Sequence, residues 1–306
     1  MSSSIASENA LQTPAPLDLL ARYHPTQPVA PTPFWLPGLS SGIVGGLIGD
    51  STLGKSWISL LLMHDWALQT HLTQLPITQQ GIAGYLSLED GDAVLSLRLH
   101  ALAPYLTSQH IARSNAMMRV WDWSGMPVGD WDTRIQQIES LATQVQILII
   151  DHLRRLHGLD ENSNNEMARV IGDLQYVAQK THTTILTVHH TPTIIPRDRL
   201  SSPRMAFPAD SSQTLRARGA GVIHNLWRWC AGLSPRHDGG FDFIVLQART
   251  GIASRTVIGS FQRNGPEGMP RPYTLADPAP PGMMGNASPG TQDAPRFAVS
   301  KPRKTL

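Results

Sequence analysis

Residues 43–56 read IVGGLIGDSTLGKS, an apolar run followed by a short loop with two glycines, a lysine and a serine. The last eight of them, residues 49–56, match the spacing G-x-x-x-x-G-K-[S/T] of a phosphate-binding loop. The apolar residues before the loop predict a buried strand, and the apolar-rich residues 56–70 predict a helix after it. Backbone N–H groups of such a loop and the N-terminus of the helix attract the same anion. The stretch therefore predicts a strand–loop–helix unit that binds a nucleoside triphosphate.

The residue types in this loop suit both phosphate and metal. Lys55 is expected to neutralise the β and γ phosphates of ATP, and Ser56 is expected to offer its hydroxyl to Mg²⁺. Leu53 is bulkier than the residue that usually precedes the second glycine. The candidate nucleotide-binding residues are Gly49, Asp50, Ser51, Thr52, Leu53, Gly54, Lys55, Ser56 and Trp57.

Outside this unit, short apolar runs first alternate with helical patterns and then follow one another without helices. Further strands are expected at 82–88, 119–123, 145–150 and 183–189. Further helices are expected at 90–106, with Asp92 as N-cap, at 133–144, directly after Asp132, and at 165–180. The late strand segments are 221–233, 241–248 and 254–261. This order predicts an α/β fold with a mostly parallel twisted sheet, helices on both faces and a C-terminal antiparallel extension.

Composition limits the class of protein. The chain has 306 residues, of which 41% are hydrophobic, and its 25 basic and 23 acidic side chains nearly cancel. A disordered chain would be less apolar and more strongly charged. The single cysteine, Cys230, excludes a disulfide scaffold and fits a reducing compartment. No apolar run reaches the ~18–20 residues that span a bilayer, and residues 1–16 do not resemble a secretory signal, so we expect a cytoplasmic protein without membrane contact.

Proline marks the ends of the folded region. Most of the 24 prolines fall near the two ends of the chain, where they oppose helices and central strands. We expect a Pro-rich, disordered N-terminal tail at 1–37, an ATPase domain at 38–264, and a Pro/Gly-rich basic tail at 265–306.

Acidic residues end two of the predicted strands. Asp151 follows the apolar run 145–150, and Glu89 and Asp90 follow 82–88. The carboxyl ends of parallel strands meet at one edge, where ligands of open α/β sheets gather. Asp151 is the candidate for the metal shell, and Glu89 for orienting the attacking water. The alternative for Asp151 is a helix-capping aspartate, and the alternative for Glu89 and Asp90 is a solvated turn between strand and helix.

His189 and His190 end another predicted strand at the same edge. Three interpretations stay open: a polar contact to the γ-phosphate, a metal site shared with Asp151, or two core histidines.

Several stretches together resemble the RepA-type replicative helicases of broad-host-range plasmids, members of the RecA/DnaB-like group of hexameric ATPases. These stretches are GLIGDSTLGKS, YLSLEDGDAVLSLRLHAL, LIIDHLRRLHGLDENSNNEMARVIGDLQYVAQ, ILTVHH and RGAGVIHNLWRW, within about residues 35–251. The resemblance implies a RecA core, a ring of six subunits with ATP between them, and movement along single-stranded DNA. It implies that Lys55 and Ser56 are the Walker A pair and Asp151 the Walker B aspartate. It also implies that Glu89 is the catalytic glutamate and that His190 is a polar sensor.

The resemblance also assigns DNA and trans-acting residues. The loop 191–218 looks like the channel-facing DNA loop, and it holds five arginines against two aspartates. Its candidate DNA-binding residues are Arg197, Arg199 and Arg204. Arg249 or Arg218 is the candidate arginine finger that reaches a neighbour's ATP. Gln247 stands where relatives carry a lysine, and Asn225 where they carry an aspartate.

The leading expectation is an ATP-dependent hexameric DNA helicase or translocase of plasmid or phage replication, with a replication initiator or primase as further partners. One alternative is a RecA-like regulatory ATPase that does not unwind DNA. Another is a DNA-binding replication-control protein that uses ATP only to assemble. A metal-dependent hydrolase built on His189, His190 and Asp151 is the most distant alternative.

Overall fold

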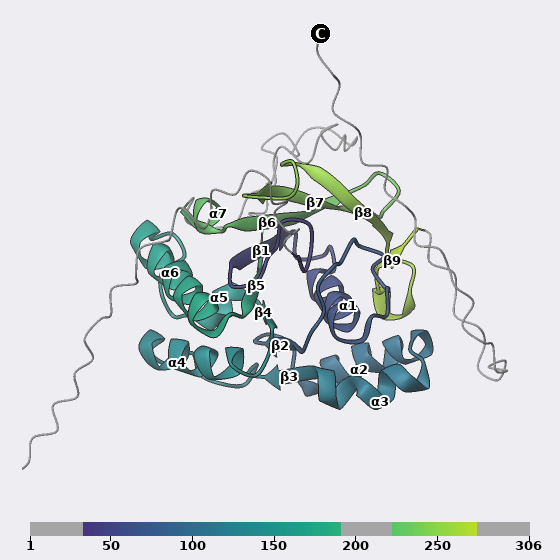
Figure 1. Ribbon diagram of the computed structural model, residues 1–306, viewed down its shortest axis with the longest axis horizontal. Helices are drawn as coiled ribbons and strands as arrows, with labels where there is room; N and C mark the ends of the chain where they lie inside the picture. Colours follow the sequence, from purple (N-terminus) through teal and green to yellow (C-terminus); the bar gives the residue numbers. More distant parts are fainter. Residues whose placement is uncertain (1–32, 191–221, 274–306) are drawn as a thin grey trace, which may run out of the picture. The chain divides into compact units, whose positions relative to one another are not determined.

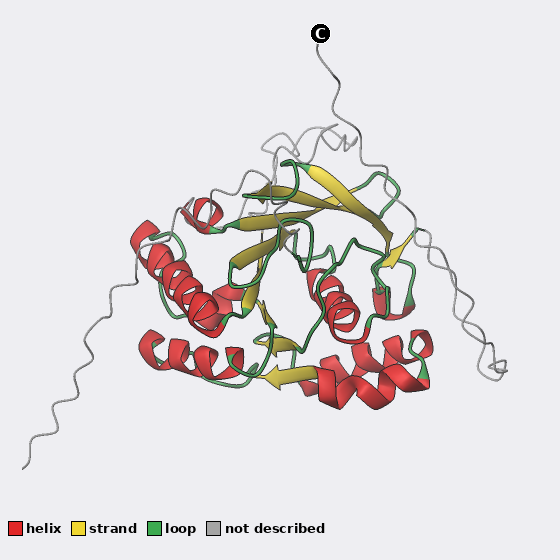
Figure 2. Cartoon of the chain, in the orientation of Figure 1, coloured by secondary structure: helices red, strands yellow, loops and turns green. Residues whose placement is uncertain are grey.

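The computed structural model describes residues 33–190 and 222–273. In these two ranges the chain forms a nine-stranded sheet in the order β3-β2-β4-β5-β1-β6-β7-β8-β9, with helices on both faces (Figures 1 and 2). Neighbours from β3 to β6 pair in parallel, and the pairs β6–β7, β7–β8 and β8–β9 are antiparallel. The predicted α/β class and the antiparallel extension are confirmed.

The elements have the following bounds. The strands are β1 (Val44–Gly49), β2 (Ala83–Ser87), β3 (Met118–Asp122), β4 (Ile147–Asp151), β5 (Thr184–His190), β6 (Trp229–Pro235), β7 (Phe241–Ala248), β8 (Thr256–Gln262) and β9 (Arg271–Pro272). The α-helices are α1 (Lys55–Leu68), α2 (Asp92–Leu102), α3 (Ser108–Met117), α4 (Trp131–Ala142), α5 (Leu153–Leu156), α6 (Asn164–Thr181) and α7 (Val222–Leu226). Two short 3₁₀ helices are η1 (Ala103–Tyr105) and η4 (Pro266–Gly268).

The sheet separates two apolar cores, because successive side chains of a strand point to opposite faces. In β1, Leu47 packs into the core beside α1, whereas Ile48 packs into the core beside α4 and α6. In β4 the same alternation places Ile149 on the first side and Ile150 on the second. Figure 1 shows α1, α2 and α3 on one side of the parallel strands and α4 and α6 on the other. Burial on both faces explains why these strands read as continuous apolar runs.

Close packing fixes the position of β1 beside the extension. A Cβ on Gly46 would lie 2.5 Å from the ring of Trp227, so only glycine leaves room for that buried indole. The indole N–H of Trp229 donates to the Pro37 carbonyl at 2.9 Å. These contacts hold the strand that carries the phosphate-binding loop.

Packed structure continues beyond the predicted bounds of 38–264 at both ends. Trp35 and Leu36 are fully buried, and Trp35 accepts a hydrogen bond from the Trp66 indole at 2.8 Å. At the other end, Met269 is buried beside η4, and β9 pairs with β8. Prolines are tolerated here because they lie in turns and in an edge strand, where no ladder hydrogen bond is lost.

Two local expectations were wrong. The N-cap of α2 is Gly91, with Asp92 as its first residue. Residues 222–226, expected as strand, form α7. The sequence analysis also missed α3, a helix that buries no residue fully and therefore lacks an apolar stripe.

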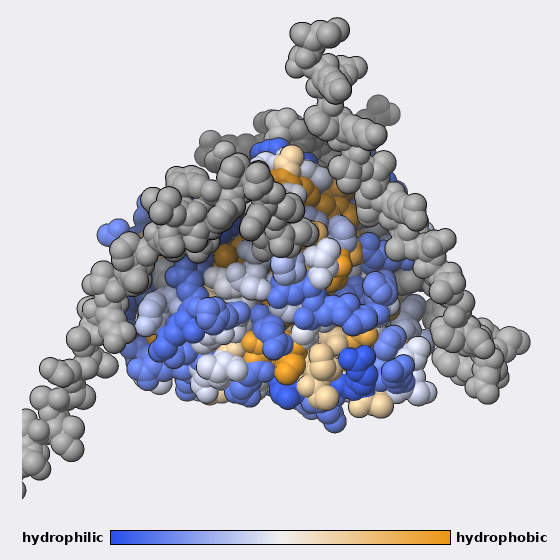
Figure 3. Space-filling view, in the orientation of Figure 1, coloured by the Kyte–Doolittle hydropathy of each residue, from blue (hydrophilic) through white to orange (hydrophobic). Residues whose placement is uncertain are grey.

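The surface shown in Figure 3 is mainly hydrophilic, with apolar colour in small separate groups. Among the described residues, no helix has both the length and the apolar content needed to cross a membrane.

Candidate active site

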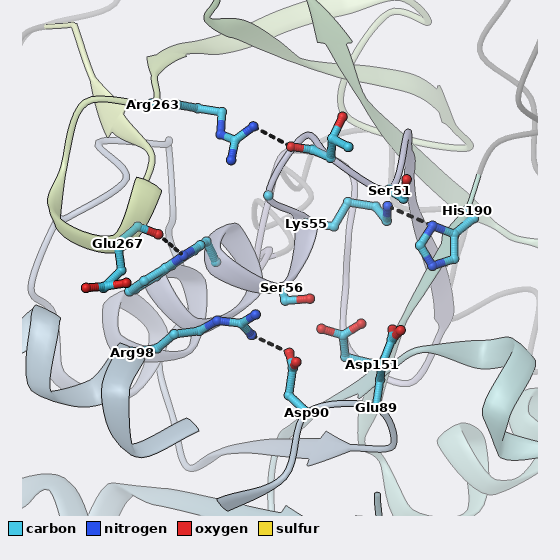
Figure 4. A pocket seen from close by; sticks show the side chains of 13 residues that line it. Ser51, Lys55, Ser56, Glu89, Asp90, Arg98, Asp151, His190, Arg263 and Glu267 are labelled. Carbon is cyan, nitrogen blue, oxygen red and sulfur yellow. Dashed lines mark hydrogen bonds and ion pairs between the residues drawn. The ribbon is translucent and has the colours of Figure 1, made fainter. Parts of the chain in front are cut away.

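Four parallel strands deliver polar residues to the same edge of the sheet. The strand register pairs Gly49 of β1 with His190 of β5, and Ser87 of β2 with Asp151 of β4. A pocket of about 580 Å³ opens at this edge (Figure 4). Its lining residues are Ser51, Thr52, Gly54, Lys55, Ser56, Trp57, Glu89, Asp90, Arg98, Asp151, His190, Arg263 and Glu267. The structure thus brings together the loop, the two acids and the histidine that the sequence pointed to.

The loop between β1 and α1 directs Lys55 into this pocket. Gly54 takes a left-handed conformation (φ 80°, ψ 34°) as the N-cap of α1, a conformation that favours glycine. The Lys55 ammonium donates to the carbonyls of Gly49 at 2.9 Å and Asp50 at 2.8 Å. It also lies 3.2 Å from Nδ1 of His190. Burial lowers the pKa of Lys55 to about 8, although Asp151, Asp50 and Glu89 raise it.

Asp151 is held rigidly at the end of β4. It is 5% exposed, and its Oδ2 accepts a hydrogen bond from the Tyr85 hydroxyl at 2.6 Å. Its main-chain carbonyl accepts from the N–H of Leu88 at 2.8 Å, which ties the end of β2 to β4. The Ser56 hydroxyl lines the same pocket. A carboxylate and a hydroxyl are hard oxygen donors, the set that Mg²⁺ prefers beside phosphate, so these residues fit that ion.

Glu89 is the exposed acid of the site. Its side chain is 54% exposed, and Figure 4 shows its carboxylate beside that of Asp151. Oε2 of Glu89 lies 3.1 Å from Nδ1 of His152, whose ring packs edge-on against His190 with centroids 4.8 Å apart. The pKa of each of His152 and His190 is lowered to about 4, mainly by burial, and for His190 the nearby Lys55 charge contributes to the lowering. Both rings are therefore neutral at pH 7.

His189 and His190 lie on opposite faces of β5. His189 is buried and packs against Trp227 with ring centroids 6.2 Å apart, on the side away from the pocket. The metal set His189, His190 and Asp151 is therefore not brought together, and that interpretation was wrong. The histidine that does join His190 is His152, which the sequence analysis did not single out although it directly follows Asp151.

The rim of the pocket contains residues that sequence patterns did not indicate. Arg98 of α2 forms an ion pair with Asp90, and its guanidinium lies 5.8 Å from the centre of the Trp57 ring. The Trp57 indole donates to the carbonyl of Glu267 at 3.2 Å. Arg263 donates to the carbonyl of Thr52 at 2.5 Å. The segment after β8 therefore lies over the phosphate-binding loop. No pattern of neighbouring residues in the sequence predicts this long-range contact.

The remaining candidates lie elsewhere. Arg249 is exposed just after β7 and does not line the pocket, and the side-chain amide of Gln247 donates to the Trp227 carbonyl at 3.1 Å. Asn225 lies in α7. A role for Arg249 in a neighbour's site remains a prediction, because one chain does not contain that site. Arg197, Arg199, Arg204 and Arg218 fall outside the described residues.

Comparison with protein families agrees with this geometry. A family model described as AAA domain matches residues 12–193, more than half of the chain. The matched span includes Lys55, Glu89, Asp151 and His190, all of which line the pocket.

Proposed function

The chain belongs to the AAA domain family, and from that premise we propose that its pocket hydrolyses ATP to drive movement along single-stranded DNA. The observation that carries the ATPase part is the meeting of Lys55, Asp151 and Glu89 in one pocket beside a phosphate-binding loop. The family supports an ATPase in general. The helicase part rests on the resemblance to RepA-type hexameric helicases.

The loop and Lys55 bind the triphosphate. Main-chain N–H groups of the loop and the N-terminus of α1 surround the phosphate oxygens, and Lys55 places its charge on the β and γ groups. Ser56 and Asp151 would hold Mg²⁺, which supplies charge neutralisation on the phosphates when it is bound. The Lys55 ammonium already donates to the carbonyls of Gly49 and Asp50. It therefore lies beside the loop that would hold the phosphates.

Glu89 orients the water that attacks the γ-phosphorus. The water oxygen forms a bond to phosphorus, the bond from phosphorus to the β,γ-bridging oxygen breaks, and the water proton passes to the Glu89 carboxylate. The products are ADP and inorganic phosphate. His190, neutral and 3.2 Å from the Lys55 ammonium, would contact the γ-phosphate. An arginine from a neighbouring subunit, Arg249 or Arg218, would complete the charge on the transferring group.

The test of this proposal combines turnover with particle mass. We expect Mg²⁺-dependent ATP hydrolysis that single-stranded DNA stimulates, together with a mass of six chains when nucleotide is present. Hydrolysis unaffected by DNA, in a particle of one chain, would contradict the motor but not the ATPase.

One contact favours a second candidate, an ATPase that changes its assembly state without unwinding DNA. Gln247 stands where the resembling helicases carry a lysine, and its amide is engaged with Trp227 of the same chain. A forked DNA substrate distinguishes the two. Strand separation coupled to ATP hydrolysis supports the helicase, and turnover or nucleotide-dependent assembly without separation supports the switch.

A further inference from the structure

We propose that Glu89, His152 and His190 form a binding site for a divalent transition-metal ion such as Zn²⁺. The proposal has a second part, which rests on the proposed function: the bound ion occupies the carboxylate that ATP hydrolysis needs and so inhibits turnover.

The three side chains come from three different strand ends: Glu89 and His190 line the pocket, and the buried His152 lies directly behind them. One ligand atom from each residue lies within 4.8 Å of the other two, and Glu89 and His152 are already 3.1 Å apart. Tetrahedral ligands held ~2.0–2.2 Å from Zn²⁺ lie roughly 3.4 Å from one another, so the set closes when its ligand atoms approach by at most about 1.4 Å. Glu89 is half exposed and can make that movement, whereas burial holds His152 in place.

The donor set differs from the one that suits Mg²⁺. Imidazole nitrogens favour Zn²⁺ and its neighbours in the transition series, whereas carboxylate and hydroxyl oxygens favour Mg²⁺. Two sets of donor atoms therefore lie next to each other: the oxygens of Ser56 and Asp151 in the pocket, and a mixed set of Glu89, His190 and, behind the pocket wall, His152. Three protein ligands leave a fourth position, which a water or a phosphate oxygen can fill.

Lys55 opposes metal binding at His190. Its ammonium lies 3.2 Å from Nδ1 of His190, and a ring nitrogen that accepts from a lysine leaves the ring proton on the other nitrogen. Figure 4 shows that this second nitrogen lies on the side of the Glu89 carboxylate. Removing the lysine charge should therefore leave metal affinity unchanged or raise it.

Direct binding of the metal tests the site without reference to catalysis. The metal-free full-length chain is titrated with Zn²⁺ against a chromogenic chelator, and with Co²⁺ while its visible bands are recorded. We expect one tight ion per chain. Loss of a second-shell partner costs about 10–100-fold in metal affinity, so His152→Asn, which removes a direct ligand, should weaken binding by about 100-fold or more. Glu89→Gln should weaken it in the same direction.

Two variants serve as controls. His182→Asn removes an exposed histidine outside the pocket, at a left-handed backbone position (φ 55°) that asparagine tolerates, and should bind Zn²⁺ as the wild type does. Lys55→Ala should bind at least as tightly as the wild type. The site would be overturned if the wild type, His152→Asn and Glu89→Gln bound Zn²⁺ with equal affinity. It would also be overturned if His182→Asn lost as much Zn²⁺ affinity as the two site variants.

Inhibition is measured against each variant's own zinc-free ATPase rate, with Mg²⁺ constant. Zn²⁺ should inhibit the wild type, a chelator selective for Zn²⁺ over Mg²⁺ should reverse this, and His152→Asn should resist at the same concentration. A chain that binds Zn²⁺ at this site but never hydrolyses ATP contradicts the proposed function and leaves the site standing. A chain that hydrolyses ATP but binds no Zn²⁺ contradicts the site and leaves the function standing.

Discussion

The carboxyl ends of β1, β2, β4 and β5 lead into the reactive side chains of the pocket, whereas the segment after β8 contacts the loop and the start of α1 through the Arg263 guanidinium and the Glu267 main-chain carbonyl. Lys55, Glu89 and Asp151 come from the parallel half. Arg263 and the Glu267 carbonyl, from the extension, contact Thr52 and Trp57. The contrast indicates that chemistry resides in the parallel strands and that the extension positions the loop. Changes in the first region should abolish turnover, and changes in the second should only weaken ATP binding.

The largest effect is expected for Lys55→Ala. The variant loses the charge that faces the β and γ phosphates, and one such electrostatic donor is worth roughly 10²–10³-fold in rate. Because Lys55 also contributes to binding, we expect kcat/KM for ATP to fall at least about 10³-fold. ATPase assays measure the loss, and circular dichroism should show an unchanged fold. If this variant hydrolysed ATP at the wild-type rate, the phosphate-binding loop would have no role in hydrolysis.

Glu89→Gln should separate binding from hydrolysis. The amide cannot take the water proton, and a positioned base contributes roughly 10²–10⁴-fold, so kcat should fall by that order while nucleotide affinity stays similar. Glu267→Gln is the matched control, because Glu267 lines the same pocket but contacts Trp57 through its main-chain oxygen, which the substitution keeps. Equal losses in both variants would show that Glu89 has no special role.

The pH dependence of kcat/KM should report Lys55. Its pKa in the folded chain is about 8, so the free protein loses this positive charge as pH rises past 8, and kcat/KM for ATP should then fall about tenfold per pH unit. The unfolded chain keeps the proton up to the ordinary value of 10.5, so this group makes the free energy of unfolding rise with pH between about 8 and 10.5. Lys55→Arg, whose charge persists, should lose both effects. A profile that is flat to pH 10 in the wild type contradicts the assignment.

The smallest effect is expected for Arg263→Ala, which cuts the extension's contact with the loop. An exposed charge-assisted hydrogen bond contributes on the order of 1 kcal/mol, so KM for ATP should rise about fivefold with kcat nearly unchanged. Arg228→Ala is the control, because this exposed arginine precedes β6 at the opposite end of the strand from the pocket. If kcat fell as much in Arg263→Ala as in Glu89→Gln, the extension would take part in catalysis and the two regions would not differ in role.

Local sequence patterns predicted the parallel half well, because its elements are apolar on a regular period. The strands β1, β2, β4 and β5 fall where apolar runs were seen, and in α6 the residues Met167, Val170 and Leu174 are buried as the helical spacing indicated. The caps were less predictable. Asp92, expected as a cap, is the first residue of α2 after Gly91, whereas α4 is capped by Asp130, whose side chain accepts from the N–H of Thr133.

The phosphate-binding loop, the acids at two strand ends and the α/β class could be predicted from the sequence, because each depends on residues that are close together in the chain. Tertiary structure alone decided that His152 joins Glu89 and His190 while His189 turns away toward Trp227. It also decided that Arg263 reaches Thr52 across more than two hundred residues. The physical reason is that strand pairing and the alternation of side chains between two faces set these contacts, and neither register nor long-range pairing is encoded by spacing within a segment.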